Sequence, residues 1–151
     1  MGDMWKADED IHRMMRDLVA SHHPDLALVV DEILVVFTEK GGKSTVPGSA
    51  SRVSDTTNLV GGTKYKFMIT LPADKWEHEL GAKEREILLN HHLFSCRVDD
   101  DPNSADLKCY IVKPDVVAFS ENVEIYGPRA MFAPKDEEPP QKSGPISDEE
   151  S

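Results

Sequence analysis

The hydrophobic period changes early in the chain, and this change constrains the fold more than any other feature of the sequence. Apolar residues recur at helical spacing from residue 8 to residue 21, which predicts an amphipathic helix. The segment His22 to Pro24 ends this helix, because a proline disfavours helical geometry in the residue before it. The run Val29 to Phe37 is rich in β-branched residues and precedes Gly41-Gly42, which predicts a strand and then a turn. Helices and strands therefore belong to the same fold.

The mixed pattern continues through the middle of the chain. The segments 48–59 and 65–71 alternate in polarity, which predicts two further strands of one sheet. The segment after Pro72 predicts a short helix, a break at Gly81 and a second helix that carries His91. The second helix contains the candidate chemistry.

The last ordered part is predicted to add a strand and a helix. Residues 99–103 form a strong turn signal, residues 107–112 read as a short strand, and residues 115–126 as a closing helix. The fold class is therefore α+β, with a three- to four-stranded sheet packed against two or three helices. The side chains expected to be buried together are Trp76, Leu88, Leu89, Phe119 and Val123.

Length and composition define the domain organisation. The 151 residues, 39% of them hydrophobic, are enough for one domain with one core, which we assign to residues 1–134. Residues 135–151 carry six acidic side chains and two lysines without apolar periodicity, and we predict a disordered acidic tail.

The charge and the cysteine count exclude several classes of protein. A net charge of -11 argues against direct nucleic-acid binding, and it favours either simple solubility or an acidic face for a basic partner. Cys96 and Cys109 are too few for a disulfide framework, and the charged N-terminus does not resemble a signal peptide. No apolar run approaches the roughly 18 residues of a membrane span. We therefore expect a cytoplasmic protein with two reduced, partly buried cysteines.

The second predicted helix contains part of a metal-binding pattern. A zinc hydrolase of the HExxH type needs two histidines one helical turn apart and a glutamate beside the first. The corresponding stretch here is LLNHHLFSC, residues 88–96. Together with HHPDLA at residues 22–27, REILLNHHLFSC at 85–96 and KPDVVAFSENVEIYG at 113–127, it resembles the putative phage metallopeptidase family.

The resemblance implies a zincin-like domain, but it also implies that the metal site is degenerate. The family helix reads roughly ALLDHELCHC, and His91 matches its first ligand. His92 stands at the catalytic glutamate and Ser95 at the second histidine. Pro114 stands at the third histidine, immediately before Asp115. The resemblance therefore predicts that zinc hydrolysis by the family mechanism is absent and that no cofactor is bound.

Other ligand combinations remain open. His91, His92 and Cys96 offer good zinc donors, although adjacent helical residues point about 100° apart. A divergent zinc metallohydrolase with reassigned ligands could instead use His22, His23, His78 and His91. Two other segments resemble metal-binding motifs less closely. The pair His78-Glu79 lacks a second histidine at Ala82, and the acidic turn at residues 99–106 lacks the glycine and glutamate of a calcium loop.

Three functional hypotheses follow. The first is an inactive metallopeptidase-like phage or prophage protein in the host cytoplasm, which binds a host protein and inhibits it or mimics nucleic acid. The second is the divergent zinc enzyme. The third is a small structural protein whose acidic tail keeps it in solution.

Overall fold

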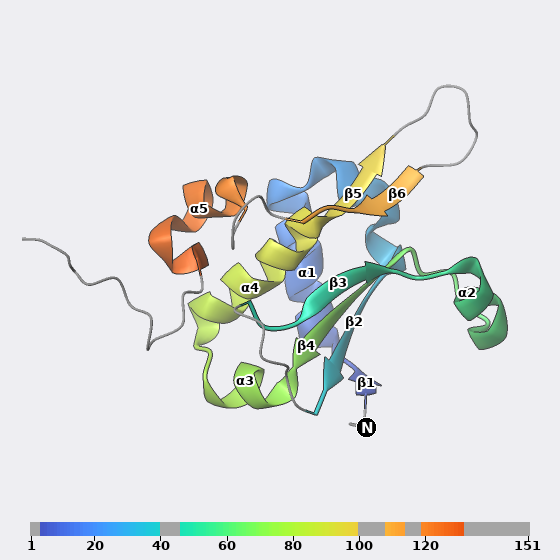
Figure 1. Ribbon diagram of the computed structural model, residues 1–151, viewed down its shortest axis with the longest axis horizontal. Coiled ribbons are helices and arrows are strands. Elements are labelled where there is room, and N and C mark those ends of the chain that lie inside the picture. Colours follow the sequence, from blue (N-terminus) through green and yellow to red (C-terminus); the bar gives the residue numbers. More distant parts are fainter. Residues whose placement is uncertain (1–3, 40–45, 100–107, 114–118, 132–151) are drawn as a thin grey trace, which may run out of the picture.

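The computed structural model describes residues 4–39, 46–99, 108–113 and 119–131 of the chain (Figure 1). Strands, α-helices and two 3-10 helices alternate along it. In chain order they are β1 (Met4–Lys6), α1 (Glu9–His22), η1 (Pro24–Glu32), β2 (Ile33–Thr38), β3 (Ser49–Arg52), α2 (Asp55–Gly61), β4 (Phe67–Pro72), α3 (Ala73–His78), α4 (Ala82–Ser95), β5 (Cys96–Asp99), β6 (Lys108–Ile111), α5 (Ser120–Tyr126) and η2 (Gly127–Met131).

A mixed four-stranded sheet forms the centre of the fold. Its order is β1-β2-β4-β3, with β2 and β4 parallel and both outer pairs antiparallel. The parallel register places Val35 opposite Ile69 and Phe37 opposite Leu71. These side chains are buried, as expected for inner strands whose core-facing positions recur with period two.

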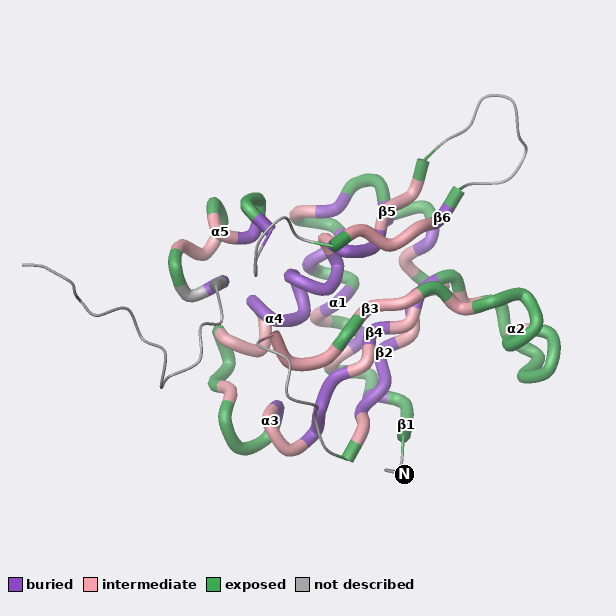
Figure 2. The backbone as a smooth tube through the Cα atoms, viewed as in Figure 1, coloured by how far each residue is buried: buried purple, intermediate pink, exposed green. Residues whose placement is uncertain are grey.

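Helices α1 and α4 form the layer that packs on this sheet. Helix α1 contacts β2, helix α4 contacts β3, and the two helices contact each other. Asp8 begins α1, because its side chain accepts a hydrogen bond from the Ile11 backbone amide at 3.2 Å. Helix α4 is the more deeply buried of the two, and most of its second half is buried (Figure 2). His91 and His92, which α4 carries, therefore lie inside the molecule.

The α+β prediction is confirmed, and so are several of its elements. Helices α1, α3 and α4 lie where the sequence predicts them, and His23 follows the end of α1. The number of strands in the main sheet agrees with the expected three to four, but its edge strand β1 was not predicted, and the predicted strand at residues 107–112 lies outside this sheet. The hairpin of β5 and β6 adds a second sheet, of which only β6 was anticipated. Both cysteines are free and buried, and Cys109 lies in β6 opposite Val98.

Two predicted strands are shorter than expected. Residues 29–32 belong to η1, which is kinked at Val29, where φ is -122° and ψ is 17°, and Leu26 and Val29 are buried. Residues 55–59 belong to α2, which the Ser54 side chain caps through the Thr57 amide at 3.1 Å. Burial accompanies the first departure and side-chain capping the second.

The closing helix also differs from its prediction. Helix α5 begins at Ser120, and Phe119 is its extended N-terminal cap residue. Phe119 is buried beside α4 rather than in the main core cluster, and Val123 is only partly buried. The expected common cluster is therefore correct for Trp76, Leu88 and Leu89 and wrong for Phe119 and Val123.

Other predictions fall on residues whose structure is not described. These include the turn at Gly41-Gly42, most of the acidic turn after Asp99, Pro114 with Asp115, and the tail 135–151. Within the described residues, no helix combines the length and apolar character that crossing a membrane requires.

Candidate functional site

Helix α4 carries four polar residues into the interior. Asn90, His91, His92 and Ser95 are all buried, although such side chains are usually exposed. A buried polar group is costly unless a hydrogen bond satisfies it. The partners of these four residues therefore determine what the helix can do.

His92 is bound to the backbone that leads into β3. Its Nε2 atom lies 2.7 Å from the Pro47 carbonyl oxygen, and because a carbonyl only accepts, Nε2 carries the hydrogen and donates it. Burial lowers the pKa of His92 to about 4, although the Pro47 carbonyl opposes this shift. His92 is therefore neutral at neutral pH.

Gly48 allows this close approach. Its φ is +83°, and a Cβ atom there would lie 2.3 Å from the Thr70 carbonyl oxygen and 3.2 Å from the His92 Nε2 atom. Only glycine accepts both the left-handed backbone and the lack of space. The segment 47–48 consequently closes tightly over the His92 ring.

His91 packs among rings. Its ring centroid lies 5.2 Å from that of His92 at an interplanar angle of 89° and 5.2 Å from that of Phe119 at 58°. Burial, and secondarily the neighbouring His92, lowers the pKa of His91 to about 3. The two imidazoles meet edge to face.

A chain of hydrogen bonds links α1, α4 and α5 through the interior. His23 donates from Nε2 to Asn90 Oδ1 at 2.6 Å, Asn90 donates to Asn122 Oδ1 at 3.0 Å, and Asn122 donates to the Ile87 carbonyl at 3.3 Å. Each of these three donor atoms is therefore within hydrogen-bond distance of an acceptor. Burial lowers the pKa of His23, and the bond to Asn90 opposes the change.

The end of α4 is closed by Cys96. Its thiol donates to the His92 carbonyl oxygen at 3.6 Å, and burial raises its pKa to about 12. A thiol in this state is a poor nucleophile and a poor metal ligand. The Ser95 carbonyl accepts from the Val112 amide at 2.9 Å, so Ser95 joins α4 to the residue after β6.

The histidines of the divergent-enzyme hypothesis are spread over three helices or their ends. His22 and His23 lie at the end of α1, His78 is exposed at the end of α3, and His91 is buried in α4. Across residues 4–39, 46–99, 108–113 and 119–131, no three or more His, Cys, Asp or Glu side chains form a group that could hold a metal ion. Pro114 lies outside these ranges.

Sequence reasoning missed the amide side chains. Asn90 and Asn122 complete the buried chain, but asparagine in a helix ordinarily reads as a solvent-facing residue. His12 was also unexpected: its Nε2 atom accepts from the Val35 amide at 3.2 Å and joins α1 to β2. The one available signal was position, since Asn90 immediately precedes the two histidines on a helix with apolar residues on several sides.

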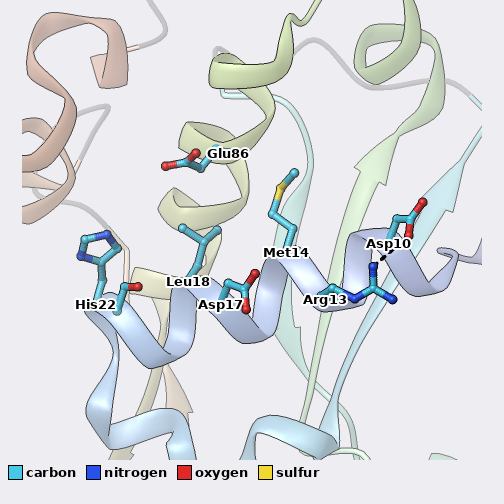
Figure 3. A pocket seen from close by; sticks show the side chains of 8 residues that line it. Asp10, Arg13, Met14, Asp17, Leu18, His22 and Glu86 are labelled. Carbon is cyan, nitrogen blue, oxygen red and sulfur yellow. Dashed lines mark hydrogen bonds and ion pairs between the residues drawn. The ribbon is translucent and has the colours of Figure 1, made fainter.

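A groove of about 440 Å³ lies on the surface between α1 and α4 (Figure 3). Asp10, Asp17 and Glu86 supply acidic groups to its lining, and the partly buried Met14 and the buried Leu18 supply its apolar side chains. A hydrogen bond from the Tyr126 hydroxyl lowers the pKa of Glu86, which favours the ionised carboxylate. The groove is therefore acidic at neutral pH.

The architecture defines a class, a small α+β protein built around a buried central helix. The comparison with family models identifies that class more closely: the chain belongs to the family described as putative phage metallopeptidase, whose model matches residues 3–137. No curated protein and no solved structure matches the chain. Family membership thus agrees with the resemblance that residues 22–27, 85–96 and 113–127 indicate.

Proposed function

We propose that this chain is a catalytically inactive member of its family that acts as an acidic protein-binding module. The observation that carries the proposal is the state of His92, which stands where the family has its catalytic glutamate. Its Nε2 hydrogen is donated to the Pro47 carbonyl oxygen at 2.7 Å, under a backbone that Gly48 brings into close contact. A general base must reach the proton that it removes with a free lone pair. The His92 Nε2 atom has no lone pair to offer, and the lone pair of Nδ1 belongs to a ring whose pKa burial lowers to about 4, which makes it a weak base at neutral pH.

The ligand positions support the same proposal. Ser95 replaces the second family histidine with a hydroxyl, and Pro114 replaces the third with a side chain that has no donor atom. Zinc sites take three or four donors from Cys, His, Asp and Glu. His91 alone does not meet that requirement, and the described residues near it do not fit a zinc ion.

The binding role rests on charge. A net charge of -11 on 151 residues produces a strong negative field, which speeds association with positively charged surfaces. Basic proteins that bind nucleic acid present such surfaces, and an acidic protein competes for them. The partner we propose is a basic host protein, and the specific form of the role is inhibition of a host factor by nucleic-acid mimicry.

The test is affinity capture from host lysate by the purified chain in buffers of low and high salt. We expect basic proteins to be retained at low salt and released at high salt or by added duplex DNA. Deletion of residues 135–151 serves as the companion variant, because it separates binding by the tail from binding by the folded domain. A chain that retains no protein at low salt would contradict the binding role.

A further inference from the structure

The segment from Arg52 to Lys66, here called the α2 arm, exposes the two adjacent apolar residues Leu59 and Val60. Helix α2 projects from the body of the protein (Figure 1) and has no buried residue. Leu59 and Val60 are 83% and 84% exposed, the highest values among the large hydrophobic residues that the structure describes. Nothing in the described chain covers them.

Local hydrogen bonds hold the arm in place although it buries no side chain of its helix. Ser54 caps the N-terminus of α2, and Gly62 ends the helix in the left-handed conformation with a φ of +66°. Asn58 fixes the return of the chain, since its side chain donates to the Tyr65 carbonyl at 2.8 Å and accepts from the Tyr65 amide at 3.0 Å. A short helix without a buried face is marginal in water, so a surface that it docks against would explain why it is maintained.

The charge of the arm is opposite to that of the rest of the chain. Arg52, Lys64 and Lys66 are exposed and outnumber the single acid Asp55. The arm thus carries a formal charge of +2 on a chain whose total is -11. An apolar groove with an acidic rim complements both the aliphatic pair and the cations of the arm.

The chain itself contains such a groove. The site between α1 and α4 combines the apolar Met14 and Leu18 with the carboxylates Asp10, Asp17 and Glu86, and Arg13 partly offsets the charge through its ion pair with Asp10 at 3.4 Å. Its volume of about 440 Å³ is in the usual range for ligand pockets. Asp17 is exposed and is therefore open to an incoming cation.

We propose that the α2 arm of one molecule docks into the α1–α4 groove of a second copy, with Leu59 and Val60 on the apolar surface and Lys64 near Asp17. The two surfaces are different, so the contact is heterologous and propagates from molecule to molecule. This inference goes beyond the proposed function, because it concerns a contact between copies of the chain and not a host partner.

The test measures the mass of the purified full-length chain by light scattering over a range of concentrations at low salt. The wild-type mass is expected to rise above the 16.9 kDa monomer and to fall again at high salt. The double variant Leu59→Ser/Val60→Ser and the groove variant Asp17→Lys should each weaken association by about tenfold or more, the latter by placing like charges together. Asp17→Asn should weaken it less. All variants are checked for native circular dichroism.

Mixing supplies the decisive result. The arm variant keeps an intact groove and the groove variant keeps an intact arm, so an equimolar mixture should form pairs of twice the monomer mass and nothing larger. The matched control is Leu28→Ser, because Leu28 is 73% exposed but lies in η1, and it should associate like the wild type. A monomeric wild type, a mixture that stays monomeric, or an equal effect of Leu28→Ser would each overturn the proposal. So would binding of a monomeric chain to anionic vesicles through the arm.

Discussion

At the residue scale, burial keeps the interior histidines neutral, and hydrogen-bond partners orient two of the rings. His92 donates to Pro47, and His23 donates to Asn90 in a chain that ends on the Ile87 carbonyl. His91 lies between two rings, and the pKa of each of these three histidines is lowered chiefly by burial. The folded protein therefore holds them in the neutral form, and protonation favours the unfolded chain.

The first prediction concerns acid stability. Because the pKa of His92 is about 4 in the folded chain and near 6.5 in the unfolded chain, its contribution to stability is complete above pH 6.5 and is lost progressively as the pH falls toward 4. The loss is on the order of 3 kcal/mol for this residue alone. Denaturant titrations between pH 7.5 and pH 4.5 measure it.

The matched variant for this prediction is His92→Gln, which retains a side-chain donor for the Pro47 carbonyl but does not titrate. It should reduce the slope of the free energy of unfolding against pH. An unchanged slope would mean that His92 is already protonated or solvated in the native state.

The second prediction concerns the buried amides. Asn90→Ala removes both the acceptor of the His23 hydrogen and the donor to Asn122, so it should destabilise the fold by about 3 kcal/mol. Thermal unfolding measures the change. Thr57→Ala, on the exposed α2, is the comparison and should change the stability by less than about 0.5 kcal/mol. Equal effects of the two substitutions would contradict the buried chain.

At the element scale, α4 is a core helix, and the segment 47–48 before β3 packs over its His92 ring. Ile87, Leu88, Leu89 and Leu93 are fully buried, while the polar positions of the same helix turn to His23, Pro47 and Asn122. The helix is thus surrounded on several sides. Leu88, Leu89 and Leu93 belong to the core cluster that includes the sheet. His91 contacts Phe119, and His92 contacts Pro47 before β3.

The third prediction tests the packing of α4 against the sheet. Leu89→Ala should destabilise the protein by about 2–5 kcal/mol, because it opens a cavity in a fully buried position. Leu59→Ala makes the same chemical change at an exposed position and should cost less than about 0.5 kcal/mol. Chemical denaturation of the two variants gives the comparison. Similar small costs would show that α4 is not the core helix.

The fourth prediction tests the cover over His92. Gly48→Ala combines a left-handed φ of +83° with a contact of 2.3 Å to the Thr70 carbonyl oxygen. Gly62→Ala has a similar φ of +66° but no heavy atom within 4 Å of the added Cβ. The second variant should lose about 1 kcal/mol through conformation alone, and the first should lose clearly more. Equal losses, measured by thermal unfolding, would argue against the tight closure.

At the scale of the whole molecule, the sequence predicts the framework better than the site. The periods that define α1 and β4 were readable because tertiary packing agrees with the local pattern there, and the start of α4 was readable from the break at Gly81. The helix α2 was misread as a strand because its capping residue, Ser54, gave a weaker signal than the surrounding alternation. The chain from His23 through Asn90 to Asn122 joins residues far apart in sequence, which no local pattern reports.

The central claim is that this member of the metallopeptidase family keeps the fold without the metal chemistry, and the zinc content of the purified, untagged chain tests it most directly. Inductively coupled plasma mass spectrometry should find near-zero zinc per chain. The variant His92→Glu/Ser95→His/Pro114→His, which introduces the residues that the family resemblance assigns to these positions, is the positive control and should take up zinc. About one zinc per wild-type chain would contradict the account and make His91 and its true neighbours the catalytic candidates.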